Sequence, residues 1–254
     1  MKEIKELEDI LYIGSIVGKA NVLLENFQYD EAIELLKNIP EDLDKGLLST
    51  VLTTRGDAYL HKGDYPHAIT LLKDALKHIY PDIRSQALSL LGQSYFWNKQ
   101  YDEAIDIVEE KIALLINSRS TSRKYLFVDH NLIGDAFLQM GEYQKAIKAF
   151  EKALSIKADY QEAQHNVTLA KFKQEQGKNP DFTLDSTTIT NEVRWWDFFG
   201  TDVQAEGVHT GVIWKFDWGI LCLHKALEYD PENDDIKRGL EVFTYNRGLC
   251  IKLM

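Results

Sequence analysis

The sequence contains one short motif four times, at nearly regular spacing. The copies read YDEAI, YPHAI, YDEAI and YQKAI. Their alanines, which lie 36, 36 and 42 residues apart, are Ala32, Ala68, Ala104 and Ala146. A small residue stands twelve positions before each alanine, at Ala20, Gly56, Gly92 and Gly134. Self-similarity at such a period is typical of an array in which each repeat packs on the next.

The best-preserved copy extends from Asn131 to Ala158 and reads NLIGDAFLQMGEYQKAIKAFEKALSIKA. Its apolar residues recur at steps of three and four on both sides of Met140–Glu142, which predicts two amphipathic helices joined by a turn. Gly141 suits that turn because glycine adopts positive φ without a steric penalty. Gly134 and Ala146 are expected where the two helices approach closely.

The spaced Gly, Tyr, Ala, Phe and Ala positions of this copy resemble the tetratricopeptide repeat (TPR), a helix-turn-helix unit. The resemblance implies an all-α fold, a TPR-like α-solenoid in which antiparallel helix pairs form a right-handed superhelix. It also implies that the first helices line a concave groove that binds a protein or peptide. The turn glycine is present only as Gly63 and Gly141, and Phe27 and Lys99 replace it in the other two copies.

The repeats divide the chain into three regions. We expect residues 1–177 to form an array of about four repeats plus a following helix. Residues 178–192 contain Gly, Pro, Asn, Ser and Thr without a helical period, which predicts a linker. Residues 193–254 are expected to hold an aromatic insertion, a degenerate repeat and a C-terminal capping helix. The longer third spacing places a Ser-rich insertion at residues 117–124, either a solvated loop or a docking or phosphorylation loop.

Charge and apolar content restrict the partners. Lys and Arg number 29 against 40 Asp and Glu, a formal net charge of -11. Nucleic acid and anionic membranes need a positive surface, so we expect neither as a partner. A protein with basic patches fits better, although an acidic balance also serves solubility alone. The mixed-charge N-terminus and the lack of a long apolar run predict a cytoplasmic protein. Cys222 and Cys250 are expected to be buried thiols, with a disulfide left open.

Motifs for catalysis or metal binding are not found in the sequence. It contains no GxSxG, GxxxxGK[ST] or HExxH, and its seven histidines are scattered. The acidic run at residues 230–235 lacks the spacing of a calcium-binding loop. We therefore expect no cofactor, no metal and no enzymatic activity. An enzyme with a site near residues 193–218 is a minor alternative.

The groove residues implied by the resemblance are those on the first helices that packing does not use. They are Asn21, Asp57, His61, Gln93, Phe96, Trp97, Asn131, Asp135 and Gln139. The aromatic pair either anchors a ligand or packs on the neighbouring repeat. TPR proteins that clamp a chaperone's C-terminal carboxylate use Lys and Arg in the groove. The matching positions hold Val17, Thr53 and Ser89, so we do not expect a carboxylate-clamp binder.

A second candidate surface lies in the aromatic segment Arg194–Phe199, which includes Trp195 and Trp196. These rings either form a protein-binding lip or fill a core, since exposed clusters of this kind favour aggregation. The leading hypothesis is a non-catalytic interaction scaffold or adaptor. The alternative is a dedicated chaperone, inhibitor or immunity-type protein that masks one partner with this segment. Deletion of residues 193–254 would separate them, because only a mask should lose its partner.

Overall fold

The computed structural model describes residues 2–39, 43–78, 81–118, 121–178, 213–229 and 231–252. Every regular element in these ranges is helical, which confirms the all-α prediction. The chain divides into two compact units, Met1–Ala163 and Gln164–Met254. The division falls near the start of the helix that follows the repeats.

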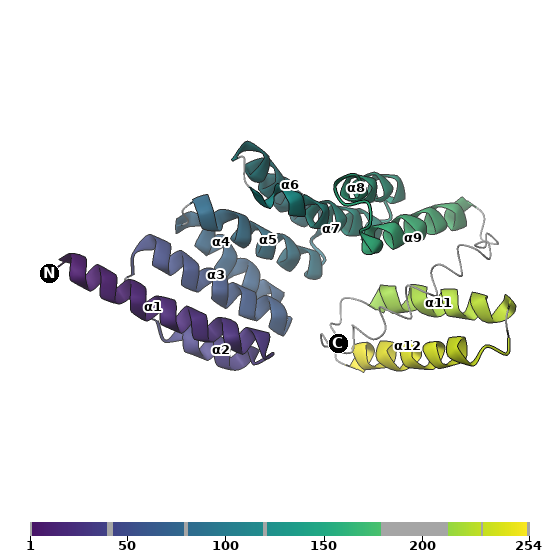
Figure 1. Ribbon diagram of the computed structural model, residues 1–254, viewed down its shortest axis with the longest axis horizontal. Coiled ribbons are helices and arrows are strands. Elements are labelled where there is room, and N and C mark those ends of the chain that lie inside the picture. The colour runs from purple at the N-terminus through teal and green to yellow at the C-terminus, as the bar shows by residue number, and fades with distance from the viewer. Residues whose placement is uncertain are drawn as a thin grey trace. The chain divides into compact units, whose positions relative to one another are not determined.

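The first unit is a row of four antiparallel helix pairs (Figure 1). We call the first member of each pair a first helix and the other a second helix. The first helices are α1 (Lys2–Glu25), α3 (Lys45–Lys62), α5 (Pro81–Trp97) and α7 (Leu126–Gln139). The second helices are α2 (Tyr29–Lys37), α4 (Tyr65–His78), α6 (Tyr101–Asn117) and α8 (Tyr143–Ile156). In each repeat the motif tyrosine is the first residue of the second helix.

The motif residues are packing residues, as the sequence indicated. The four motif alanines are at most 1% exposed. A Cβ atom added to Gly134 would lie only 2.4 Å from the ring of Phe150, which is itself fully buried. A Cβ atom added to Gly92 would likewise lie 2.6 Å from a methyl group of Val108. In the third and fourth repeats the first and second helices therefore come into contact at a glycine that no larger residue can replace without displacing its neighbour.

The turn between the helices has the same geometry in all four repeats, although only two of them contain glycine. The turn residue has a positive φ at Phe27 (60°), Gly63 (85°), Lys99 (63°) and Gly141 (76°). In each case the next N–H donates to a carbonyl in the last turn of the first helix, at 2.9 Å, as Gln100 N does to Tyr95 O. This pattern is a Schellman motif, which satisfies carbonyls at the helix end. Phe27 and Lys99 thus adopt a conformation that is unfavourable for their residue type.

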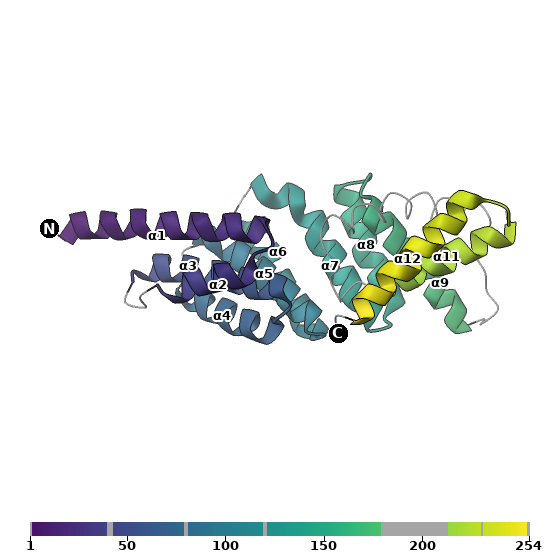
Figure 2. The same cartoon turned by 90° about the horizontal axis from the view of Figure 1, so that it is seen from below.

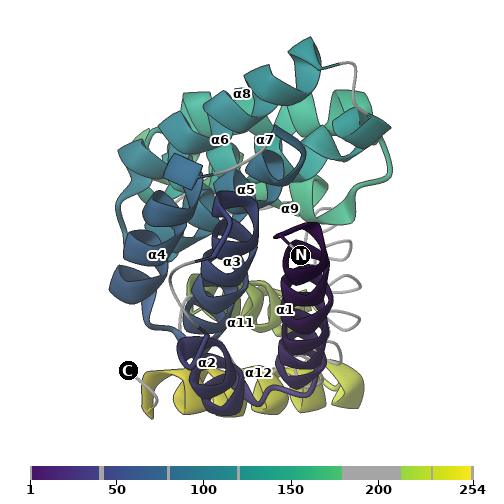
Figure 3. The same cartoon turned by 90° about the vertical axis from the view of Figure 1, so that its left-hand side faces the viewer.

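Neighbouring first helices lie side by side along the row, as the view from the α1 end shows for α1 and α3 (Figure 3). Apolar side chains between successive pairs form two core clusters. One is centred on Leu36 and Val51, between the first two repeats. The other includes Leu72, Leu91, Val108 and further residues from the second to the fourth repeat. Helix α1 is much longer than α2 and extends past it at the N-terminal end (Figure 2).

The predicted insertion before the fourth repeat is partly helical. Helix α6 continues to Asn117, and η1 (Thr121–Tyr125) is a short 3-10 helix that leads into α7. Arg123 Nε donates to the carbonyl of Leu115 at 3.0 Å, which ties this segment back to the end of α6. The insertion therefore lengthens the connection without separating the repeats.

The second unit contains most of α9 (Gln161–Lys178), together with α11 (Ile213–Tyr229) and α12 (Asp234–Lys252). The latter two pack against each other through Leu223, Ala226 and Phe243. Helix α11 begins at Ile213, within the region where the sequence predicted an aromatic insertion and a degenerate repeat. The predicted linker beyond Lys178 lies outside the described residues. Trp195 and Trp196 of the aromatic segment lie outside them as well. None of the described helices is long and apolar enough to span a membrane.

Candidate protein-binding surfaces

The predicted groove residues of the first two repeats lie on the surface of the first helices. Asn21 on α1 is exposed. On α3, His61 Nδ1 lies 2.9 Å from Asp57 Oδ1, with the side chains 45% and 21% exposed. The hydrogen bond to Asp57 raises the pKa of His61 above its ordinary value, although burial acts in the opposite direction. This pair is a partly exposed polar site whose charge depends on pH.

In the third repeat the structure shows that Phe96 and Trp97 differ in burial, which the sequence alone did not indicate. Phe96 is only 5% exposed, and its ring centroid lies 5.6 Å from that of Tyr101. Trp97 is half-buried, and its ring lies against Phe96 in a T-shaped contact at 4.9 Å. Gln93 is also half-buried. Phe96 therefore packs in the core, whereas part of Trp97 stays accessible beside Gln93.

The predicted residues of the fourth repeat are mostly buried. Asn131 and Asp135 are 4% and 7% exposed, and Asn131 Nδ2 donates to Asp135 Oδ2 at 3.2 Å. Burial raises the pKa of Tyr160, and the charges of Glu162 and Asp135 raise it further. Gln139 remains half-exposed. Only Gln139 is thus accessible to a ligand here, so charge reversal at Asp135 would disturb the core rather than report on binding.

A buried ion pair joins the third and fourth repeats. Lys111 Nζ on α6 lies 2.6 Å from Asp129 Oδ1 on α7, and it also donates to Ser89 Oγ on α5 at 3.1 Å. The two charged side chains are only 14% and 6% exposed. Burial raises the pKa of Asp129, and Lys111 partly reverses this effect. This cluster connects three helices and has a structural role.

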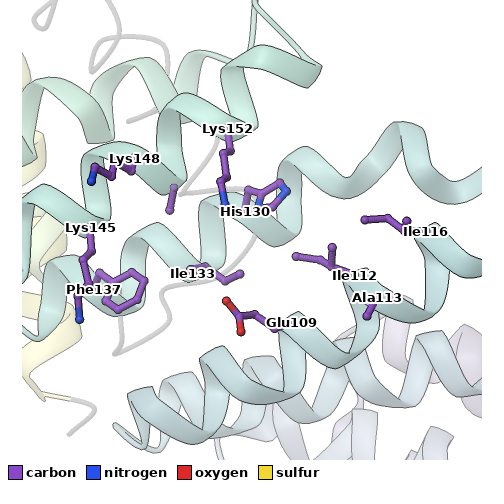
Figure 4. Close-up of a pocket in the computed structure, with 11 residues that line it drawn as sticks. Glu109, Ile112, Ala113, Ile116, His130, Ile133, Phe137, Lys145, Lys148 and Lys152 are labelled. Carbon is purple, nitrogen blue, oxygen red and sulfur yellow. The ribbon is translucent and has the colours of Figure 1, made fainter.

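A pocket that was not predicted from the sequence lies between α6, α7 and α8 (Figure 4). Its volume is about 420 Å³. Apolar side chains form its floor, namely Ile112, Ala113, Ile133, Phe137 and Ala149. Charged and polar side chains surround them, namely Glu109, His130, Lys145, Lys148 and Lys152. We call this site the second-helix pocket. The three lysines, spaced three and four residues apart on one helix, were the sequence signal that could have revealed it.

The rim of the second-helix pocket has more positive than negative charge. Lys145 Nζ lies 2.5 Å from Glu142 and 5.2 Å from the centre of the Phe137 ring. Within the described ranges, neither Lys148 nor Lys152 forms an ion pair. Burial and the nearby charge of Lys152 lower the pKa of His130, which favours its neutral form. Two ammonium groups are thus available at the edge of an apolar cavity.

Comparison with known families identifies the array. Residues 84–159 match the tetratricopeptide repeat family, and residues 25–111 match the family of anaphase-promoting complex, cyclosome, subunit 3. The chain is a tetratricopeptide-repeat protein. Together these matches include all four turns and motif alanines described above. No curated protein sequence matches the chain significantly.

Solved structures share the fold of this TPR protein. A Podosopora anserina protein with nearly identical TPR-like repeats is 20% identical, with a TM-score of 0.53 over 65% of this chain and 87% of that one. MamA from residue 41 to its end, from Desulfovibrio magneticus RS-1, is also 20% identical, with a TM-score of 0.52 and the same coverage. A TPR protein from Parabacteroides merdae is 13% identical, with a TM-score of 0.50 over 91% of this chain and 98% of that one. At these identities the likeness concerns the fold.

The repeat fold supports a protein-interaction scaffold. No group of three or more His, Cys, Asp or Glu side chains that could hold a metal ion occurs among the described residues. Buried Asp129 contacts the neighbouring repeat through Lys111, and buried Asp135 accepts a hydrogen bond from Asn131 within α7. The accessible surfaces include the partly exposed row on the first helices and the second-helix pocket.

Proposed function

We propose that this TPR protein is a non-catalytic scaffold that binds a protein or peptide along its first helices. The observation that carries the proposal is the partly exposed row formed by Asn21, the Asp57–His61 pair, Gln93 and Trp97. These residues occupy two equivalent positions, one helical turn apart, on three successive first helices. Trp97 offers an apolar anchor of the kind found at interface hot spots, and the other side chains offer hydrogen bonds.

The array is suited to this role because its helices are formed before binding. A ligand that meets preformed helices does not need to order them, so less of its binding free energy is lost. The Asp57 carboxylate favours a partner with a basic group near the bound segment, in agreement with the acidic balance of the chain. The row lacks the cations that a carboxylate clamp requires, and Thr53 and Ser89 stand at the matching positions.

The test is affinity capture with the full-length chain, followed by quantitative identification of the proteins that copurify. The variant Asp57→Lys with Trp97→Leu should lose roughly 90% or more of a genuine partner, because it reverses the charge and shortens the anchor. The matched control is Asp106→Lys with Tyr125→Leu, which makes equivalent substitutions at exposed positions of α6 and η1. Equal recovery on all three proteins would exclude the first-helix row as the binding surface.

A protein that masks one partner with its aromatic segment can be tested with the deletion of residues 193–254. Retention of the captured partner by the shortened chain is the result that the scaffold proposal requires.

A further inference from the structure

The second-helix pocket lies where the fourth repeat departs from the other three. When the repeats are aligned on their motif alanines, the residue three positions later is Leu35, Leu71, Ile107 and Ala149. Leu35 and Ile107 are half-buried and pack against the core clusters. The fourth repeat has a single methyl group at this position. The space that a branched side chain fills in the other repeats is therefore part of the cavity here.

The charge around the same position is also reversed in the fourth repeat. The three positions at one residue before, two after and six after the motif alanine face away from the core. They hold Glu31, Glu34 and Asn38 in the first repeat, His67, Thr70 and Asp74 in the second, Glu103, Asp106 and Glu110 in the third, and Lys145, Lys148 and Lys152 in the fourth. A cationic rim thus coincides with the cavity, on a chain whose net charge is -11.

The pocket and the first-helix row lie on different sides of α7. An α-helix turns about 100° per residue, so His130, Ile133 and Phe137 lie on one side. Asn131, Asp135 and Gln139 lie on roughly the opposite side. A ligand in the second-helix pocket would therefore not compete directly with one bound along the first helices, and the inference goes beyond the function proposed above.

We propose that the second-helix pocket binds an acidic amphipathic segment of a partner protein. An apolar side chain of that segment enters the cavity and contacts Ile133, Phe137 and Ala149. Carboxylates on the same segment pair with Lys148 and Lys152, which form no ion pair within the described part of the chain. The volume of about 420 Å³ far exceeds the roughly 30 Å³ of one water molecule and accommodates whole side chains.

Charge complementarity identifies the class of occupant. Three ammonium groups and the single carboxylate of Glu109 line the pocket, and His130 favours its neutral form. A basic segment would meet these lysines with like charge, whereas an acidic one is attracted to them. A purely acidic segment would leave the apolar floor uncovered. The combination of an apolar floor with a cationic edge fits an amphipathic helix whose polar flank is acidic.

The experiment measures binding of a defined peptide to the full-length chain by fluorescence anisotropy. The probe is a fluorescein-labelled peptide of about 15 residues, with leucines at helical steps of three and four and glutamates at its other positions. A second peptide carries lysine in place of every glutamate. We expect saturable binding of the acidic peptide, and binding roughly tenfold weaker or more for the basic one.

Two variants test the two halves of the site. Lys148→Glu with Lys152→Glu should weaken binding of the acidic peptide roughly tenfold or more, through loss of charge attraction. Ala149→Ile should weaken it by a similar factor, because it restores the side chain that the third repeat has at this register. Its helical content and melting temperature should stay close to those of the parent chain. The matched charge control is Lys37→Glu with Lys77→Glu, at exposed positions of α2 and α4, and it should bind as the parent does.

Three results would overturn the proposal. The first is an absence of saturable binding of the acidic peptide to the parent chain. The second is equal affinity of the Ala149→Ile variant and the parent. The third is concentration-dependent self-association in sedimentation that Lys148→Glu with Lys152→Glu abolishes, since a second copy of this chain would then be the occupant.

Discussion

Replacement of Lys111 by methionine is the sharpest test of how the third and fourth repeats are joined. Methionine keeps most of the length and the apolar stem of lysine, so the packing around it changes little. The substitution removes the ammonium group that lies 2.6 Å from Asp129 and 3.1 Å from Ser89. Asp129, which is 6% exposed, then keeps a buried carboxylate without its cation.

The expected loss is about 3 kcal/mol in the free energy of unfolding, since removal of one partner from a buried ion pair costs roughly 3–5 kcal/mol. The lower end applies because Lys111 is 14% exposed and because Asp129 can take up a proton instead of remaining ionised. The double variant Lys111→Met with Asp129→Leu should recover most of the loss, since it leaves no buried charge. The control Lys77→Met breaks an exposed pair and should change stability by less than about 0.5 kcal/mol.

The pH dependence of the stability loss in the Lys111→Met variant is a second test of the buried ion pair. Burial raises the pKa of Asp129. Folding therefore favours the protonated carboxyl, and this contribution to stability is present at low pH and is lost as the pH rises through the folded-state pKa. Loss of Lys111 raises that pKa further. The deficit of the variant should thus be smallest near about pH 4 and should grow towards about pH 7.

The assay is urea unfolding followed by circular dichroism at several pH values, with hydrogen exchange to locate the effect. Repeat arrays can unfold in parts, so exchange of the amides of α7 and α8 shows whether the loss is local to the junction. A deficit that stays constant from acid to neutral pH would refute the assignment of the loss to a stranded Asp129 charge. A deficit no larger than that of the Lys77→Met control would refute the pair's structural role.

Three further predictions follow from named contacts. Lys99→Gly should raise the free energy of unfolding, measured by urea titration, by about 0.5–1 kcal/mol. Glycine removes the strain of the left-handed backbone conformation at this residue, and this gain exceeds the added conformational entropy of the unfolded chain. A lower free energy of unfolding would contradict this prediction. Gly134→Ala should lower the melting temperature, because the added methyl group overlaps the Phe150 ring at a cost of about 1–3 kcal/mol. Gly18→Ala, in open space on α1, should be neutral or stabilising. Equal effects of the two substitutions would show that the contact between Gly134 and Phe150 leaves room for a methyl group. Asp57→Asn should lower the pKa of His61, which an NMR titration measures. The substitution should also remove a contribution to stability that is present below the ordinary histidine pKa and is lost as the pH rises through the raised pKa of His61. An unchanged pKa of His61 would show that Asp57 does not interact with it.

The repeat architecture was predictable because its determinants are short-range. The motif alanines and Gly134 mark places where backbones approach closely, and the tyrosines mark the starts of the second helices. The apolar spacing of three and four residues identifies the buried face of each helix without reference to the rest of the chain. These features predicted the fold class and about four repeats.

The conformation of the turns could be predicted only in part from the sequence. The sequence indicated left-handed residues at Gly63 and Gly141, because glycine adopts that conformation freely. Phe27 and Lys99 adopt it as well, and their side chains gave no sign of this. The packing of successive helix pairs imposes one turn geometry on all four repeats, and a strain of about 1–2 kcal/mol at a single residue does not prevent it.

The sequence by itself determined which residues hold the array together, because packing within and between repeats follows a period that can be read along the chain. Only the tertiary structure decided which of the remaining residues are accessible. It placed Phe96 in the core and Trp97 partly at the surface, and it buried Asn131 and Asp135. It also showed the second-helix pocket, because a cavity is the space that three helices leave unfilled and no single helix encodes it.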